Sequence, residues 1–228
     1  MWRSFIGRRQ ARRFLWTVAL GTMAFNMQDI VLEPYGGEIL GLSVSATSAL
    51  TALMAGGSLL AFALSARLLG RGADPFRVAA AGALLGLPAF CAVIFSAPLE
   101  SPAMFRAGVA LIGFGGGLFA VGTLCAAMSL ERAEHVGLAL GAWGAVQATA
   151  AGVSVAAGGA IRDLVSGLAT QGALGEALTS NVTGYSFVYH LEIYLLFAAL
   201  VAIGPLVRST SPQARKPATQ FGLAEFPG

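Results

Sequence analysis

Residues 14–34 read FLWTVALGTMAFNMQDIVLEP, an apolar stretch whose last part carries amides and carboxylates. A helix of about 20 residues crosses roughly 30 Å of hydrocarbon at about 1.5 Å per residue. The stretch therefore predicts a membrane span that starts after Arg13. An ionised side chain at the centre of a span costs about 2.5 to 3.5 kcal/mol on insertion, and less near the interface. We expect the polar residues of this span to face another helix, water or a ligand.

Most of these polar residues fall on one face of the predicted helix. Their spacing of i, i+4, i+7 and i+11 predicts a single stripe, formed by Thr22, Asn26, Asp29 and Glu33. Gln28 lies on another side. Pro34, followed by two glycines, predicts that the helix ends there, near the outer surface. The stripe has two interpretations: a polar wall that binds a ligand or partner, or a structural network between helices.

The composition indicates that most of the chain is surrounded by lipid. Hydrophobic residues make up 56% of it and charged residues 11%, whereas soluble domains carry about 25% charge. The apolar runs predict an all-α integral membrane protein with six transmembrane helices, near 14–34, 44–67, 76–97, 103–129, 136–161 and 185–207. The flanking parts are a basic N-terminal segment, 1–13, and a C-terminal tail, 208–228. The longest connection, 163–184, is interpreted either as a surface helix or partner contact, or as a mobile connector.

The distribution of basic residues predicts the orientation in the membrane. With the N-terminus inside, twelve of the 14 Lys and Arg residues lie on the inner side, and only Arg106 and Arg162 lie outside. This asymmetry predicts that both termini are cytoplasmic. The basic residues are not interleaved with aromatic ones, as they are in a groove for single-stranded nucleic acid. We therefore expect membrane lipid, and no nucleic acid, as a partner.

Three pairs of glycines predict close contacts between helices. In each pair the two residues stand four apart, so they share one helix face: Gly82 and Gly86, Gly113 and Gly117, Gly137 and Gly141. Small residues at this spacing let the backbones of two membrane helices approach closely. We expect all three pairs to pack against neighbouring helices.

Two further polar residues are candidates for ligand binding. His190 enters the last predicted span from its outer side, and its imidazole is either a ligand for the magnesium of a chlorin or an interface residue. Glu192 stands about 200° around the same helix and must face elsewhere. Gln147, in line with Ala151 and Ser154, either lines a cavity or makes a hydrogen bond between helices.

The sequence shows no recognisable active site. It has no Ser-His-Asp, HExxH, CxxC or P-loop arrangement. The glycine run from Gly113 to Gly117 lies in the middle of a span, with no strand before it and no Lys-Ser/Thr after it. We therefore expect a protein that has no catalytic residues and is not an enzyme.

Several unusual segments resemble those of one family. They are AFNMQD at 24–29, LEPYGG at 32–37, LGLSVSA at 40–46, GLALGAWGAVQATAAG at 137–152, YHLEI at 189–193 and FGLAEFP at 221–227. These segments are similar to the PucC/LhaA family, the bacteriochlorophyll-delivery branch of the major facilitator superfamily. The resemblance extends over nearly the whole chain, and the segments are long and unusual.

The resemblance implies a fold and a role. The family normally has twelve spans, and this chain resembles the C-terminal six, which form one half built from two three-helix repeats. The implied role is a membrane assembly factor for purple-bacterial light-harvesting antenna complexes, which handles antenna polypeptides with bacteriochlorophyll as its cofactor. The implied location is the bacterial inner, photosynthetic membrane. By analogy with the superfamily, the first, second, fourth and fifth spans face a cavity, with the Asp29 stripe and Gln147 inside and His190 outside.

One half of such a fold offers only one wall of a site that forms between two halves. The chain is therefore expected to pair with an N-terminal six-span half, to pair with a second copy, or to act through its lateral surface. The implied binding residues are Asn26, Asp29, Glu33, Gln147 and His190, and His190 is the candidate magnesium ligand. An alternative function is half of a proton-coupled secondary transporter of the same superfamily. In that case Asp29 or Glu33 would be the titrating group.

Overall fold

The computed structural model describes residues 7–130 and 136–209, and every regular element in these ranges is helical. The elements are α2 (Arg9–Asn26), η1 (Met27–Ile30), α3 (Leu32–Glu38), α4 (Val44–Gly70), α5 (Pro75–Ser96), α6 (Pro102–Leu130), α7 (Val136–Thr170), η3 (Glu176–Leu178) and α8 (Val182–Ser209). Five of them, α4 to α8, are long and apolar enough to cross a membrane. The predicted all-α membrane class is therefore confirmed, whereas the predicted number of six spans is not, since α2, in the first predicted span, is not among the five.

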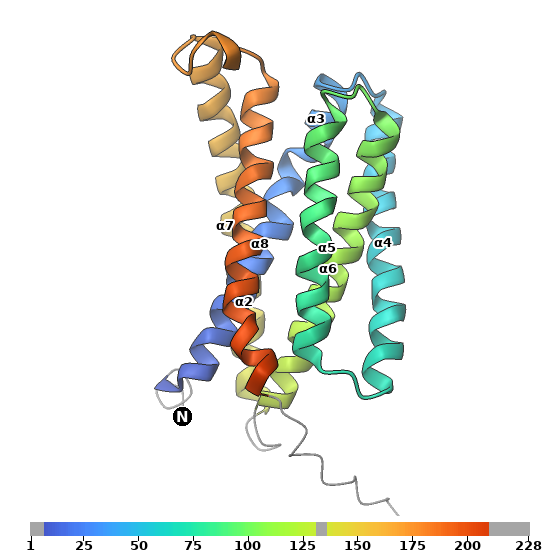
Figure 1. Ribbon diagram of the computed structural model, residues 1–228, viewed down its shortest axis with the longest axis vertical. Helices are drawn as coiled ribbons and strands as arrows, with labels where there is room; N and C mark the ends of the chain where they lie inside the picture. The colour runs from blue at the N-terminus through green and yellow to red at the C-terminus, as the bar shows by residue number, and fades with distance from the viewer. Residues whose placement is uncertain (1–6, 131–135, 210–228) are drawn as a thin grey trace, which may run out of the picture.

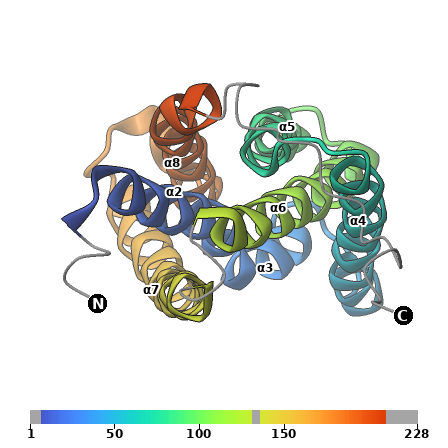
Figure 2. The same ribbon diagram turned by 90° about the horizontal axis from the view of Figure 1, so that it is seen from below.

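The long helices form two groups of three. Seen along the bundle, α2, α7 and α8 lie on one side, and α4, α5 and α6 lie on the other (Figure 2). The segment from α2 through η1 to α3 runs obliquely from the first group to the top of the second (Figure 1). The start of α2 and the end of α8 lie at the same end of the bundle (Figure 1). The oblique segment therefore joins the two groups.

The prediction of one continuous helix over 14–34 is wrong. The α-helix stops at Asn26, and residues 27–30 form a short 3-10 helix. The Asn26 side chain donates a hydrogen bond to the Thr22 carbonyl at 2.7 Å, and the Gln28 side chain donates to the Phe25 carbonyl at 3.3 Å. These amides bond carbonyls in the last turn of α2, where water is scarce. Thr22, Asn26, Asp29 and Glu33 therefore do not share one helix face.

Pro34 does not end a helix, contrary to the prediction. It stands third in α3, which continues through Gly36 and Gly37 to Glu38. The first four N–H groups of a helix have no partner within it, so a residue that lacks an N–H is tolerated there. The Tyr35 N–H, one residue later, donates to the Val31 carbonyl at 2.9 Å. The proline therefore belongs to the first turn of a new helix.

The connection predicted at 163–184 is much shorter than expected. Helix α7 continues to Thr170 and α8 begins at Val182, so residues 171–181 join them. The helix ends where Gly172 adopts a positive φ of 73° and its N–H donates to the Ala169 carbonyl at 2.9 Å. A glycine with a positive φ commonly ends a helix. The charged residues Arg162 and Asp163, where the connection was predicted to begin, do not end it.

Glycine packing holds the second group together, as the spacing predicts for two of the three pairs. A Cβ at Gly82 would lie 2.5 Å from the Gly115 carbonyl oxygen, and one at Gly113 would lie 2.0 Å from the Met54 carbonyl oxygen. Gly86 and Gly117 are similarly crowded. The third pair, on α7, has no heavy atom within 4 Å of either Cβ position in the described part of the chain. The prediction of close packing is therefore wrong for that pair within this chain.

Candidate functional site

Gln28 is a fully buried polar residue of the first segment, although the sequence placed it off the polar stripe. Its side chain is fully buried, whereas Asp29 and Glu33 are exposed. The Gln28 amide nitrogen donates to the Phe25 carbonyl, to the Asp29 carboxylate and, at 3.5 Å, to the Met54 sulfur. The 3-10 turn rotates Gln28 inward, because the helical period changes after Asn26. Gln28 could not be found from a stripe drawn with the α-helical period.

Helix α7 presses directly against this turn. A Cβ at Gly158 would lie 2.5 Å from the Met27 carbonyl oxygen, so only glycine allows the approach. Met27 is itself buried. The 3-10 turn is thus held between α7 and α8, which both contact it.

A carboxyl group from α8 lies at the same place. Glu192 is fully buried, and the Gln28 backbone and the Asp29 carboxylate are its polar neighbours. As the helical spacing predicts, Glu192 faces away from His190, but Glu192 was not among the predicted site residues. A signal was present: Glu192 stands in line with Val188, Leu196 and Ala199 at helical spacing, on a face that is otherwise apolar and buried.

The predicted stripe residues make local contacts. Asn26 is half-buried and bonds its own helix, as described above. The Glu33 carboxylate accepts a hydrogen bond from the Thr51 hydroxyl at 2.9 Å, which links α3 to α4. Asp29 accepts from Gln28. The structural network is therefore present, and whether these residues also bind a ligand stays a prediction.

A tyrosine cluster fastens α3 to α8 beside the polar turn. The Tyr35 ring lies 5.5 Å from the Tyr185 ring and 5.4 Å from the Tyr189 ring, centroid to centroid. The Tyr185 hydroxyl donates to Glu38 at 2.8 Å, and the Arg162 guanidinium lies 5.2 Å from the centre of the Tyr185 ring. Aromatic and cation–π contacts of this kind add stability beyond the buried area. This cluster gives the turn a rigid surrounding.

Gln147 and His190 lie apart from the polar turn. Gln147 is half-buried on α7, and its position eleven residues before Gly158 places it about 16 Å along the helix from the turn. His190 is exposed on α8, and its Nδ1 lies 2.6 Å from the Ser186 carbonyl oxygen. A carbonyl can only accept, so Nδ1 carries the proton and Nε2 is left with its lone pair free. The five predicted binding residues therefore do not form one site.

His190 belongs to an exposed stripe along α8. At spacings of three and four residues it is flanked by Phe187, Tyr194, Phe197 and Val201, all exposed. This set, with His190, is called the α8 stripe below. In a helix that can cross a membrane, such a stripe faces lipid or a partner. It faces away from the buried side that carries Glu192.

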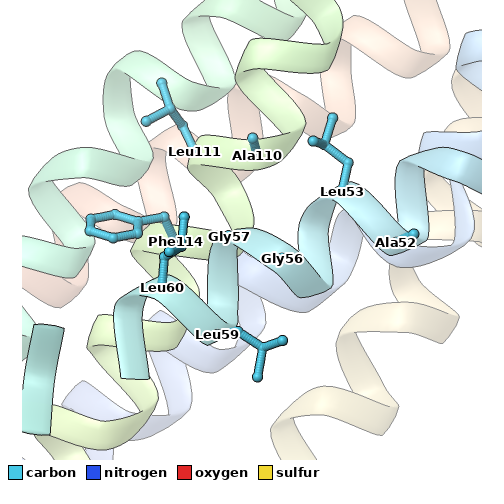
Figure 3. Close-up of a pocket in the computed structure, with 9 residues that line it drawn as sticks. All are labelled: Ala52, Leu53, Gly56, Gly57, Leu59, Leu60, Ala110, Leu111 and Phe114. Carbon is cyan, nitrogen blue, oxygen red and sulfur yellow. The ribbon is translucent and has the colours of Figure 1, made fainter. Parts of the chain in front are cut away.

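An apolar groove lies between α4 and α6 in the second group (Figure 3). It has a volume of about 660 Å³. Gly56 and Gly57 form its floor, and Leu53, Leu60 and Phe114 stand around it. A groove with this lining suits an apolar chain and offers no polar group that would select a ligand.

Comparisons with known proteins place the chain among photosynthesis proteins. A family model described as PUCC protein matches residues 1–211. An "Uncharacterized protein in puhA-bchM intergenic region" of Rhodobacter capsulatus is 50% identical, over 99% of this chain and 48% of that protein. "Protein PucC" of Cereibacter sphaeroides is 47% identical, over 91% of this chain and 44% of that protein. "Bacteriochlorophyll synthase 44.5 kDa chain" of Rhodobacter capsulatus is 29% identical, over 93% of this chain and 48% of that protein.

The chain spans about half the length of the curated relatives it matches. No solved structure matches it. These similarities agree with the family suggested by the sequence segments, and they do not favour the transporter alternative.

Proposed function

This chain belongs to the PUCC family, and from that membership we propose that it is an assembly factor for light-harvesting antenna complexes. It is a multi-pass membrane protein, and we place it in the bacterial inner, photosynthetic membrane with both termini cytoplasmic. The relative named a bacteriochlorophyll synthase chain supports bacteriochlorophyll as the pigment that is handled. Antenna polypeptides are the proposed protein partners.

The contact between His190 Nδ1 and the Ser186 carbonyl is the observation that carries the pigment part of this proposal, because in a neutral imidazole it leaves the Nε2 lone pair available. The Ser186 carbonyl oxygen lies 2.6 Å from Nδ1 and accepts a hydrogen bond from it. This contact fixes the ring and directs the other nitrogen away from the helix. Histidines that bind metals usually have this arrangement, with the second nitrogen bonded to a carbonyl or carboxylate. Bacteriochlorophyll, when bound, would supply a magnesium ion that can accept a nitrogen ligand, and His190 would provide that ligand. The residues present therefore fit this group.

The side chains around His190 suit a flat, apolar ligand. Phe187 stands one turn before it and Tyr194 one turn after it, and both are exposed. Aromatic rings pack well against other flat π-systems. No charged residue lies on the α8 stripe. The stripe can therefore hold a chlorin ring against the helix and exclude water from the imidazole.

The remaining partner is proposed to lie on the open face of α4 and α7. These helices have the smallest buried fractions among the five long helices. Since the relatives are about twice as long as this chain, an N-terminal six-span half is the first candidate partner, and a second copy is the other. Gln147, on α7, would then lie near that interface.

The proposed role is not catalytic. The relative called a synthase chain is the most distant of those described, at 29% identity. The residues named in the proposal bind and orient the pigment. None of them is proposed to make or break a covalent bond. Turnover of a pigment precursor by the purified chain would contradict this part of the proposal.

Isolation of the tagged protein from a photosynthetic bacterium in mild detergent tests the function. We expect antenna polypeptides by mass spectrometry and bacteriochlorophyll by absorbance in the same fraction. His190→Leu should reduce the bound pigment several-fold, because the imidazole that would bind the magnesium is lost. Phe197→Leu is the matched control, since it alters the same exposed stripe two turns further along and retains the imidazole and both aromatic rings beside it.

Two results would contradict these proposals. Absence of both pigment and antenna polypeptides from the isolated protein would count against the assembly role. Pigment content that is unchanged in His190→Leu would leave His190 as an interface residue. Because His190 is exposed, the variant should fold normally, and a thermal unfolding curve that matches the wild type checks this.

A further inference from the structure

The interface between η1 and α8 contains buried polar atoms without hydrogen-bond partners. Both carboxyl oxygens of Glu192, the Oε1 of Gln28 and the hydroxyl of Tyr189 are buried and unpaired among the described residues. Buried polar groups are nearly always paired in folded proteins, because an unpaired group loses its hydration without compensation. An unpaired set of this size therefore indicates a shortage of hydrogen-bond donors at this interface.

The set contains more hydrogen-bond acceptors than donors. Gln28 Oε1 and the two oxygens of a carboxylate can only accept, so the Tyr189 hydroxyl is the single donor in the set. Outside the set, the Gln28 backbone N–H faces Glu192 and can supply one hydrogen bond to it. The Gln28 amide nitrogen cannot help, because it already bonds the Phe25 carbonyl and the Asp29 carboxylate. A proton on Glu192 converts one acceptor into a donor. The carboxyl group can then donate to a neighbouring oxygen, and the set approaches balance.

The charges around Glu192 also favour its neutral form. The charged group that interacts with Glu192 is Asp29 of η1, whose negative charge would repel an ionised Glu192. The other titratable neighbours are hydroxyls: Tyr189 on α8 itself, which in turn adjoins Tyr35 and Tyr185. Two carboxylates side by side disfavour the ionisation of the more buried one.

No basic residue of the neighbouring helices is placed to neutralise Glu192. In α2, three arginines line a separate recess with Trp16 near the start of the helix. In α5, Arg77 is exposed in the first turn. In α7, Arg162 stacks on the Tyr185 ring and pairs with Asp163 at 3.1 Å. The site therefore has a negative charge nearby and no compensating cation from the described elements packed against it.

We propose that Glu192 is a proton-binding site, and that its neutral form allows the 3-10 turn to pack on α8. Release of the proton leaves a carboxylate beside Asp29 in an apolar interface, which drives the turn and the helix apart. The segment from α2 to α3 runs from one helix group to the other (Figure 1), so protonation of one side chain acts on a connection between them, alongside the direct packing of α8 on α5. The proposal rests on burial and unpaired atoms, and it does not depend on the proposed role in antenna assembly.

Infrared spectroscopy of the whole chain in lipid nanodiscs tests the proposal. A protonated carboxyl group has a C=O stretching band that an ionised carboxylate lacks. We expect the wild type to show this band at neutral pH in sodium-free buffer, and to lose it as the pH is raised. The band should be absent at neutral pH from Glu192→Gln. Glu33→Gln, which changes an exposed carboxylate of the same segment, is the matched control and should keep the band.

Asp29→Asn provides a second test that does not require Glu192 to be altered. Removal of the neighbouring negative charge should make the band disappear at a lower pH than in the wild type. The proposal is overturned if the wild type shows no such band at neutral pH, or if the band survives in Glu192→Gln. A band that vanishes on addition of sodium chloride at constant pH also overturns it, in favour of a sodium site. If Glu192→Gln does not fold, the wild-type and Asp29→Asn titrations still decide the matter.

Discussion

The glycines of α6 and α7 have the same spacing and opposite surroundings. Gly113 and Gly117 on α6 stand against the backbone of α4, with Cβ positions that would lie 2.0 Å from the Met54 carbonyl oxygen and 2.8 Å from the Ala61 Cβ. Gly137 and Gly141 on α7 have nothing within 4 Å of theirs in the described residues. A four-residue repeat of glycine therefore marks a face on which a helix can pack, and does not show that the partner is within the same chain.

The difference separates two kinds of contact. The α6 glycines are part of the core of the second helix group, since α6 also meets α5 at Gly82 and at Gly122. The α7 glycines lie on the face that we propose for an N-terminal half or a second copy. The same substitution is therefore expected to impair folding when it is made on α6 and to impair association when it is made on α7.

Gly113→Leu should have the largest effect. The added side chain would have to displace the backbone of α4, and overpacking of this kind costs about 1 to 3 kcal/mol or more. We expect a clear loss of stability in detergent, measured by unfolding in sodium dodecyl sulfate. Gly141→Leu is the matched control, because it is the same change in another long helix. Equal stability of the two variants would contradict the distinction between the two faces.

Gly141→Leu should act on association instead. The chain alone should unfold like the wild type, because no heavy atom of the described residues lies within 4 Å of the Cβ position at Gly141. Recovery of a co-expressed N-terminal half of a PUCC relative, or of a second tagged copy, should fall several-fold. Recovery that is unaffected for both partners would show that this face of α7 is covered by lipid.

Much of the fold can be predicted from the sequence because its signals are local. The predicted spans 76–97 and 103–129 agree with α5 and α6 to within about one residue. Asp74 explains one boundary, because its carboxylate accepts from the Phe76 N–H at 2.8 Å and Pro75 occupies the first position of α5. Such caps are visible in the order of the residues.

The site is harder to predict because it depends on tertiary contacts. The break at Asn26 arises because two side-chain amides bond carbonyls of their own helix, and the same residues could equally have pointed outward. Once the helix is broken, the α-helical period no longer applies to Asp29 and Glu33, and Gln28 turns inward. The spacing of α8 indicates that Glu192 is on a buried face, but not that η1 packs on that face, and this packing is what makes Glu192 a site residue.

Removal of the hydrogen bond between α6 and α7 should have the smallest effect on stability. The Trp143 indole N–H donates to the Thr123 hydroxyl at 3.2 Å, and Thr123 also donates within α6, to the Phe119 carbonyl at 2.9 Å. Side-chain hydrogen bonds between membrane helices contribute about 0.6 kcal/mol on average. Thr123→Val removes the acceptor at nearly constant volume, and Trp143→Phe removes the donor. A double-mutant cycle, measured by the same unfolding assay, should give a coupling near that value. A coupling as large as the loss in Gly113→Leu would mean that α7 is held to α6 as firmly as α6 is held to α4, and that the two faces differ less than their glycines indicate.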